Sequence, residues 1–492
     1  MSEFRGMGQA SATGQAGADR LSRVARMSKA GVALVAAGVI AAACSSTPKA
    51  KPSAHPSTGP VTITMSADGI IGGKNASEAT WLTKDVIPAF EKMEAAKGRK
   101  VTVNFQGTGV SGTDFATQLA LDLKSGGGPD VFDLDGPYYG EFVEAGYLKP
   151  LSKVVGPSYA SWSGWAQIPK SVQSITEFRG VRYGIPTGTD ARVLYYNKKL
   201  FAEAGLPTKW QPKSWADIIS AAQTIKAKDP GVTPLQIDAG TEMAEATTLQ
   251  GFLPMLAGTG TLIYSSSTNK WQGNTPQVRQ VLDFYHQIYS TGLANPTLQI
   301  GAHARSHTFE LFSQGKIAIY SESIYLYDSV IAPTPTALFP MADRDSTIGY
   351  ALIPAEKPGT GIRGQSFVSM SGGGGQTINP YTKHPRTAWA FLTFMNSKAE
   401  LLKEEGIKSF LSARRDVNAV ALKGHPQLTF VATKVLPLTA YRPSLAIYPQ
   451  VSLQIQAMVQ SVAEGTATPA AAAKQFSSAV AGLVGPTHVV NS

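Results

Sequence analysis

Two carboxylates, Asp133 and Asp135, lie two residues apart at the end of a segment that is predicted to be a strand. Side chains at this spacing point to the same face of a strand, and a pair of carboxylates can hydrolyse a glycosidic bond. Two such groups converge on one bond only by accident, however, and the chain contains no H-E-x-x-H, G-x-S-x-G or phosphate-loop motif. The sequence therefore favours binding over catalysis, with a surface-anchored glycoside hydrolase as the alternative.

Three glycines, Gly107, Gly109 and Gly112, match the G-x-G-x-x-G pattern that binds dinucleotides. The pattern follows a predicted strand and precedes a predicted helix, and Asp130 lies about 20 residues further on, as in the dinucleotide fingerprint. The same glycines serve equally well as a tight turn, and the N-terminus described below indicates export to a compartment where a soluble nicotinamide cofactor is scarce. We therefore expect no cofactor and no metal.

Strands and helices alternate over the first part of the folded chain. The apolar patterns predict strands at 61–65, 101–105 and 130–134 and helices at 80–96 and 114–124. This alternation is typical of an α/β lobe with a mainly parallel sheet, in which ligands sit outside the carboxyl ends of the strands. Asp68, Asp135 and Tyr138 follow two of these strands and are therefore candidate ligand contacts.

Residues 179–206 contain the most informative local pattern of the chain. Residues 183–186 are predicted to be extended, because Pro186 biases the residue before it away from helix. A turn of small residues at 187–190 leads into the apolar run 193–196, which is typical of a strand covered on both faces.

Two residues are predicted to begin helices. Asn197 and Ser214 each precede a helical segment, and their side chains can accept a hydrogen bond from its first turn. Trp215, directly after Ser214, is predicted to pack in the core rather than to contact a ligand.

These segments resemble the extracellular solute-binding proteins of bacterial ABC importers, the maltose-binding-like family. YGIP and LYYNKKLFAEAGL in the 179–206 stretch, PDV and AGYLKPL between 129 and 151, and the segments at 308–323 and 386–405 follow the motif order of that family. The resemblance runs from about Val61 to about Val484. It implies an α/β, two-lobed periplasmic-binding-protein-like fold of the class II type, with three crossings between the lobes and a ligand cleft between them.

The resemblance and the local composition together predict the order of segments along the chain. We expect a lipoprotein signal peptide at 1–43, a flexible Ser/Pro-rich tether at 44–60, N-lobe segments at 61–188 and 366–412, and C-lobe segments at 189–365 and 413–492. The tether is predicted from its Ser, Pro and Lys content and its lack of periodicity.

A cleft for a neutral sugar pairs planar polar side chains with aromatic rings, because sugars offer hydroxyl groups and apolar C–H faces. The candidate contacts that the strand ends and the resemblance place at the cleft are Asp68, Asp135, Tyr138, Asp190, Arg192, Glu242, Glu322, Tyr325, Gln365 and Arg414. Asp135 and Asp190 are the strongest, because the loops that carry them face each other in this family. Each candidate carboxylate could instead be a turn or cap residue, and Tyr139 could belong to the core.

The N-terminal region has the pattern of a lipoprotein signal. A basic segment precedes the apolar run 31–43, which is too short to span a membrane comfortably and ends in small residues. Cys44 follows this run directly and is the only cysteine of the chain, so an internal disulfide is excluded. The pattern resembles a lipobox, at which the cysteine is acylated, although Ala41 stands where the family prefers Leu.

The resemblance implies a substrate-binding lipoprotein on the outer face of the cell membrane, without enzymatic activity. It would capture a carbohydrate, a di- or oligosaccharide, and deliver it to the permease of an ABC importer. A glycerophosphodiester is the alternative ligand within the same family. The chain has a net charge of +10, but its basic residues are scattered, so we expect no nucleic-acid partner. We expect a monomer.

Overall fold

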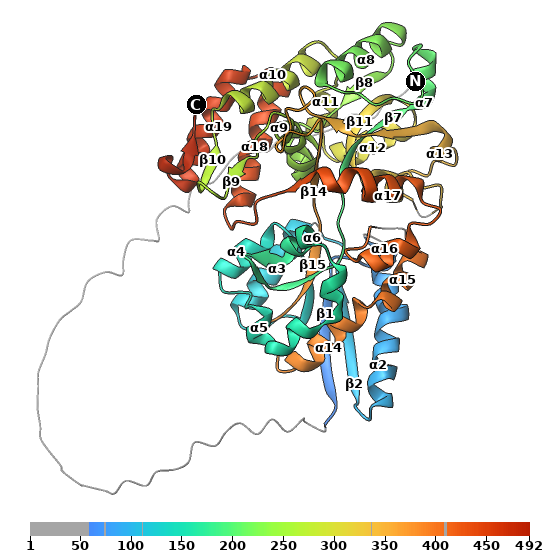
Figure 1. The fold of residues 1–492 in the computed structure, drawn as a ribbon, viewed down its shortest axis with the longest axis vertical. Helices are drawn as coiled ribbons and strands as arrows, with labels where there is room; N and C mark the ends of the chain where they lie inside the picture. Colours follow the sequence, from blue (N-terminus) through green and yellow to red (C-terminus); the bar gives the residue numbers. More distant parts are fainter. Residues whose placement is uncertain (1–58, 73–74, 111, 336, 408–410) are drawn as a thin grey trace, which may run out of the picture. The chain divides into compact units, whose positions relative to one another are not determined.

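The computed structural model describes residues 59–72, 75–110, 112–335, 337–407 and 411–492. The predicted signal peptide, Cys44 and the tether up to residue 58 lie outside these residues. Two α/β lobes are present, each built around its own sheet (Figure 1). In this part of the chain, no helix is both long enough and apolar enough to cross a membrane.

The first lobe is built on a five-stranded sheet with the strand order β2-β1-β3-β15-β6. Its strands are β1 (Val61–Ala67), β2 (Val101–Gly107), β3 (Val131–Asp135), β6 (Gly184–Pro186) and β15 (Gly374–Ile378). Strand β1 is parallel to β2 and β3, but β15 is antiparallel to both β3 and β6. Four of the five strands therefore run in the same direction, as predicted for a mainly parallel sheet, and β15 runs in the opposite direction.

Helices cover both faces of this sheet. They are α1 (Ala76–Trp81), α2 (Ile87–Ala96), α3 (Gly112–Lys124), α4 (Tyr138–Glu144), α5 (Leu151–Val154), α6 (Lys170–Gln173), α14 (Pro385–Met395), α15 (Lys398–Ile407) and α16 (Arg415–Ala421). Phe90 and Phe391 pack on one face, and Phe115 packs on the other. Adjacent residues of β3 point to opposite faces, so Val131 joins the first core and Phe132 the second.

The second lobe is built on a four-stranded sheet with the order β12-β7-β11-β8. Its strands are β7 (Arg192–Asn197), β8 (Thr233–Gln236), β11 (Ile317–Ser323) and β12 (Ile348–Ala351), and a smaller sheet joins β13 (Ile353–Pro354), β14 (Phe367–Ser371) and β16 (Thr439–Tyr441). Every residue of β7 is buried. Leu194 faces one core and Tyr195 the other, which confirms the predicted coverage of this strand on both faces.

Two helices of the second lobe begin at the positions that the sequence predicts. They are α7 (Lys198–Glu203), α8 (Trp215–Lys228), α9 (Leu253–Gly258), α10 (Pro276–Ser290), α11 (Thr297–Ile300), α12 (Ala304–Ser313), α13 (Arg344–Thr347), α17 (Pro426–Phe430), α18 (Tyr448–Ala463) and α19 (Pro469–Val484). Asn197 Oδ1 accepts from Lys199 N at 2.9 Å, and Ser214 Oγ accepts from Asp217 N at 3.3 Å. Trp215 is buried in the core, as predicted.

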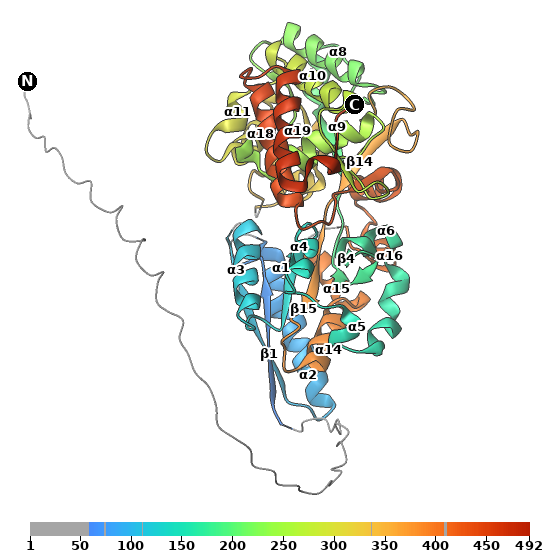
Figure 2. The ribbon, with the colours of Figure 1, turned by 90° about the vertical axis from the view of Figure 1, so that its left-hand side faces the viewer.

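Further short strands and the C-terminal helices complete the two lobes. The short strands are β4 (Glu177–Phe178) with β5 (Val181–Arg182), and β9 (Tyr264–Ser265) with β10 (Lys270–Gln272) and β17 (Val489–Val490). Helices α18 and α19 run side by side and pack with α10 (Figure 2). This packing closes the core on one face of the second lobe.

The chain passes between the two sheets at short glycine-containing segments. It leaves the first sheet after β6 and enters the second with β7, and it returns between β14 and β15. Strand β14 pairs with β13 and β16, so residues 367–371 belong to the second lobe. The sequence instead predicts that the chain returns to the first lobe at residue 366. Helix α16 packs with the first lobe through Val417, beyond the predicted boundary at 412.

Gly373 is expected to be intolerant of a side chain, because it combines a positive φ of 124° with a close backbone approach. A Cβ atom at this position would lie 2.6 Å from Gly188 O. Gly373→Ala should therefore lower the free energy of unfolding by about 2–3 kcal/mol. Gly364→Ala is the matched control, since Gly364 has a φ of 73° but no atom within 4 Å of the added Cβ. Equal losses in urea unfolding would show that the close approach contributes nothing.

Candidate functional site

Four chain segments lie side by side where the two lobes meet. The hydrogen bonds that join them run from Gly136 N to Gly373 O, from Thr187 N to Gly374 O and from Thr189 N to Leu411 O, at 3.0, 3.2 and 3.1 Å. The end of β3 is therefore held next to the two segments that connect the sheets. Polar side chains at these positions are brought together from distant parts of the sequence.

A pocket of about 210 Å³ lies against this junction. Its lining includes Thr187, Thr189, Asp190, Tyr325, Ser329 and Gly373. The Tyr325 side chain is 45% exposed, yet burial raises the pKa of its hydroxyl. Tyr325 is therefore a partly exposed aromatic side chain in the wall of this pocket.

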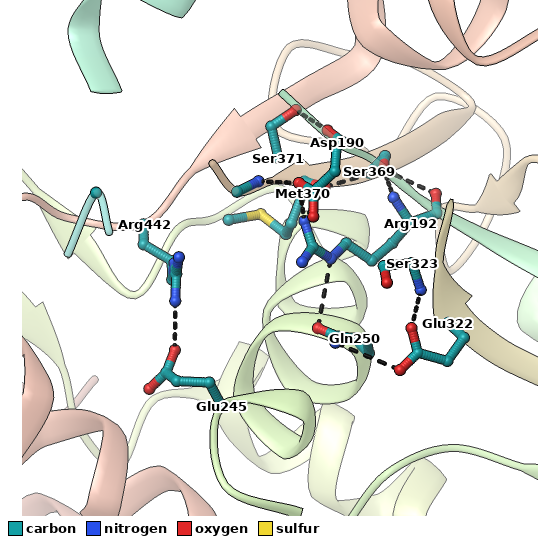
Figure 3. A network of polar contacts seen from close by, with 12 residues as sticks. Asp190, Arg192, Glu245, Gln250, Glu322, Ser323, Ser369, Met370, Ser371 and Arg442 are labelled. Atoms are coloured by element: carbon teal, nitrogen blue, oxygen red, sulfur yellow. Dashed lines mark hydrogen bonds and ion pairs between the residues drawn. The ribbon is translucent and has the colours of Figure 1, made fainter. Parts of the chain in front are cut away.

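Asp190 and Arg192 form an ion pair at the start of β7 (Figure 3). Arg192 Nη1 donates to Asp190 Oδ1 at 2.5 Å, and the same oxygen accepts from Gly372 N at 2.5 Å. Burial lowers the pKa of the Arg192 guanidinium, and the Asp190 carboxylate opposes this effect. Asp190 keeps 27% of its side-chain surface exposed, whereas Arg192 keeps 4%. Asp190 can therefore meet a ligand, and Arg192 holds it in place.

Glu322 at the end of β11 is completely buried and is balanced by Arg305. Arg305 donates to Glu322 Oε1 from Nε at 2.9 Å and also from Nη2. Gln250 Nε2 donates to the same oxygen at 3.5 Å, and Ser323 N donates to Oε2 (Figure 3). Because Glu322 has no exposed surface, it positions Arg305, whose side chain is 34% exposed.

Asp135 at the end of β3 faces an arginine of the second lobe. Arg442 Nη2 lies 3.8 Å from Asp135 Oδ2, and Arg442 Nη1 donates to Glu245 Oε2 at 2.8 Å (Figure 3). The Asp135 side chain is 54% exposed. Burial nevertheless raises the pKa of Asp135, and the Arg442 guanidinium opposes this effect. The Asp135 carboxylate is thus exposed enough to accept hydrogen bonds from a bound ligand, although protein groups lie around it.

The first-lobe side of the site is acidic. Burial raises the pKa of Asp133 well above its usual range, and the nearby carboxylates of Glu78 and Asp68 raise it further. Gln376 donates to Asp133 and opposes this rise. The strand ends of this lobe therefore offer several carboxyl oxygens close to one another.

Asp238 makes the stability of the second lobe depend on pH. Burial and the neighbouring Glu322 raise its pKa to about 7, against the effects of Arg305 and of the Tyr320 hydroxyl, which donates to Asp238 Oδ1 at 3.1 Å. In the unfolded chain the same carboxyl titrates near 3.8. Between these two pKa values the folded protein therefore binds one proton more than the unfolded chain. The stability that this proton contributes is lost as the pH rises through 7.

The free energy of unfolding should accordingly fall by about 2 kcal/mol between pH 5 and pH 7 because of Asp238. Asp238→Asn keeps a neutral side chain of the same shape at every pH, so it should remove this part of the dependence. Urea unfolding of both proteins across this range measures the difference. An unchanged slope in Asp238→Asn would contradict the assignment.

The comparisons with known proteins identify the family. Residues 74–401 match the family model of the bacterial extracellular solute-binding protein. The chain belongs to this family. A binding protein of Brucella abortus is 24% identical over 391 residues, which cover 79% of this chain and 87% of the relative.

Solved structures of solute-binding proteins share the fold. One from Thermotoga lettingae, bound with α-D-tagatose, is 24% identical with a TM-score of 0.68 and covers 86% of this chain and 100% of that one. MalE3 of T. maritima, bound with maltose, is 20% identical with a TM-score of 0.65 and covers 85% and 98%. The predicted α/β periplasmic-binding-protein-like fold is thereby confirmed. The family consists of transport receptors, so the prediction of no enzymatic activity holds and the hydrolase alternative is wrong.

The predicted contacts of this solute-binding protein fall into two groups. Asp190 and Tyr325 line the pocket at the junction, Asp135 lies close enough to Asp190 for its pKa to be raised, and Asp68 has the same effect on Asp133. Arg192 and Glu322 also lie there, but they are buried supports, so the geometry does not favour direct ligand contact by either.

The remaining predicted contacts lie in other surroundings. Arg414 is buried in the first lobe, where it donates to Asn396 O and to the Asp416 carboxylate. Gln365 Nε2 donates to Leu438 O at 3.0 Å within the second lobe. Tyr138 begins α4 and packs against the core that contains Tyr139, which has no exposed surface. Glu242 is exposed in a short helix at 241–243. Arg414 and Gln365 therefore act as internal ties in this structure.

Four residues at the junction were not predicted from the sequence. They are Glu245, Gln250, Arg305 and Arg442. None belongs to a motif of the resemblance, and Gln250 lies in a buried helical segment, where a buried amide side chain could have signalled a partner. The other three are ordinary charged residues in sequence and gain a role only through contacts across long separations.

Proposed function

We propose that this solute-binding protein captures a neutral di- or oligosaccharide between its lobes and delivers it to the permease of an ABC importer. The observation that carries the proposal is that the accessible carboxylate of Asp190 and the exposed Tyr325 line one pocket at the lobe junction, with the accessible carboxylate of Asp135 close to Asp190. Carboxylates accept hydrogen bonds from sugar hydroxyls, and an aromatic ring packs on the apolar face of a sugar.

Closure of the two lobes around the ligand is part of this proposal. Three crossings between the lobes would act as hinges, and two of them lie at the glycine-containing segments 187–191 and 372–373. Closure would exclude water and strengthen each hydrogen bond to the sugar. The sugars named for the two solved relatives, tagatose and maltose, support a carbohydrate as the ligand class.

The charge of the site favours a neutral sugar over a glycerophosphodiester. The three arginines at the junction, Arg192, Arg305 and Arg442, each pair with a carboxylate of the protein. A phosphate group would also face the acidic strand ends of the first lobe. An anionic ligand would therefore meet like charges without a free arginine among these three to balance it.

Cys44 is proposed to carry the lipid that anchors the protein to the outer face of the cell membrane. The apolar run before it and its position as the only cysteine support this proposal. Fractionation of cells that produce the wild-type chain or Cys44→Ser tests it. Acylated protein in the membrane fraction is expected for the wild type only, and an unmodified Cys44 in mass spectrometry would contradict the anchor.

A thermal-shift screen tests the proposed ligand class. The protein is heated with neutral mono-, di- and trisaccharides and, as the anionic comparison, with sn-glycero-3-phosphocholine and sn-glycerol 3-phosphate. A saturable rise in Tm with a di- or trisaccharide is expected, because a ligand that binds only the folded state stabilises it. A rise with the phosphate compounds alone would replace the sugar by a glycerophosphodiester.

A further inference from the structure

Arg442 joins a carboxylate of the first lobe to a carboxylate of the second. We propose that this arginine couples the two lobes, so that Asp135 and Glu245 are drawn together and the cleft closes more readily around a ligand. The proposal rests on the proposed function, because it concerns the affinity of the same site. Arg442 acts as a positioning residue, and Asp135 is the group that contacts the ligand.

On the second-lobe side, the guanidinium is held firmly. Arg442 directly follows β16, and its side chain is only 7% exposed. Its partner Glu245 also accepts a hydrogen bond from Tyr448 Oη at 3.3 Å and another from Ser452 Oγ, both on α18. Glu245 is thus fixed by three donors, and the 2.8 Å bond from Arg442 makes the arginine part of the second lobe.

On the first-lobe side, the same guanidinium makes a looser contact. The distance of 3.8 Å from Nη2 to Asp135 Oδ2 is within reach of an ion pair but too long for a hydrogen bond. Asp135 itself is steadied by Gly136 N, which donates to Oδ1 at 3.0 Å. This ion pair links a strand end of the first lobe to the second lobe.

The backbone next to Arg442 lies where the two lobes touch. A Cβ atom added to Gly140 of α4 would lie 2.7 Å from Ser444 O, so the segment after Arg442 touches the first lobe directly. Because Arg442 is tied to the second lobe and Asp135 to the first, a small rotation of one lobe against the other changes the separation of the two side chains. Shortening it by less than 1 Å would allow a charge-assisted hydrogen bond.

The charges around Asp135 determine whether the loss of Arg442 should bring the lobes together or move them apart. It faces Arg442 and Glu245 of the second lobe and Asp190 of the connecting segment. Without Arg442, three carboxylates would remain near one another, and their repulsion would push the lobes apart. Arg442→Met should therefore shift the unliganded protein toward a larger lobe separation and weaken saccharide binding by about tenfold, a typical size for coupling between two elements.

Single-molecule energy transfer between the lobes measures the separation directly. The full chain carries Cys44→Ser, which leaves it without cysteine, and two dye sites, Leu121→Cys and Leu453→Cys. Leu121 on α3 and Leu453 on α18 are 63% and 57% exposed, so both accept a label. Arg363→Met is the matched control, because Arg363 donates only to backbone carbonyls at 437 and 439 of the second lobe.

Without any ligand, the mean separation of the two dyes is expected to be larger in Arg442→Met than in Arg363→Met. In Arg442→Lys, it should return toward the wild-type value. In the background of Asp135→Asn, Arg442→Met should have a clearly smaller effect, because its partner charge is gone. Equal separations in Arg442→Met and Arg363→Met would overturn the coupling, and so would an effect of Arg442→Met that is unchanged by Asp135→Asn.

Titration with maltose as the probe keeps this proposal separate from the proposed function. If the wild type binds no saccharide but the separations differ as expected, the coupling stands and the carbohydrate assignment fails. If maltose binds Arg442→Met as tightly as the wild type and the separations agree, the assignment stands and the coupling fails.

Discussion

Replacing Arg305 with methionine is expected to lower the free energy of unfolding by about 3–5 kcal/mol, because it leaves a buried carboxylate without its counter-charge. Glu322 has no exposed surface, and Arg305 donates two hydrogen bonds to its Oε1 atom. The remaining donors, Gln250 Nε2 and Ser323 N, are neutral and cannot balance the charge. Urea unfolding of the variant and the wild type gives the difference.

Lys199→Met is the matched control for this prediction. Lys199 pairs with Asp343 at 2.6 Å, but both side chains are more than half exposed, at 63% and 51%. Losing such a surface pair should cost no more than about 1 kcal/mol. Replacing both buried partners, in Arg305→Met with Glu322→Met, should recover most of the loss, since no unpaired charge remains. Equal losses for Arg305→Met and Lys199→Met would show that burial of Glu322 is not the cause.

Asp135→Asn is expected to weaken saccharide binding by at least about tenfold, because a hydrogen bond to a charged acceptor contributes about 1.5–3 kcal/mol. The free energy of unfolding should change by less than about 0.5 kcal/mol, since the side chain is 54% exposed and asparagine can still accept from Gly136 N. Calorimetric titration with the saccharide found by the screen, together with urea unfolding, measures both quantities.

Asp283→Asn provides the comparison, because it removes an exposed carboxylate from α10 and leaves the junction unchanged. It should alter neither affinity nor stability. An affinity for Asp135→Asn equal to that of the Asp283 variant would remove Asp135 from the binding site. A large loss of stability in Asp135→Asn would instead indicate a structural role for this carboxylate.

Local patterns were sufficient to predict the elements that position the site. The apolar run 193–196 predicts a strand buried on both faces, and each of its residues is buried in the structure. Asn197 and Ser214 were predicted as helix caps, and both make the expected hydrogen bonds. These features depend on neighbouring residues only, so a single sequence contains the information that determines them.

The junction itself could be predicted only in part. Asp135 and Asp190 were found from a strand end and a turn, but their partners Arg442 and Gly372 lie more than 150 residues away along the chain. Glu322 was predicted to contact the ligand because the resemblance places it near the cleft, yet it is buried beneath Arg305. Pairings that form only in the folded state leave no spacing signal in the sequence.

The most direct test of the central claim is isothermal titration of the protein with neutral di- and trisaccharides, followed by analysis of the recovered sugar. We expect saturable binding of one saccharide per protein, with the sugar recovered intact and with sn-glycero-3-phosphocholine giving no heat of binding. Hydrolysis of the sugar would contradict the assignment as a receptor. Binding of the phosphodiester in the absence of any saccharide binding would contradict a neutral carbohydrate as the ligand.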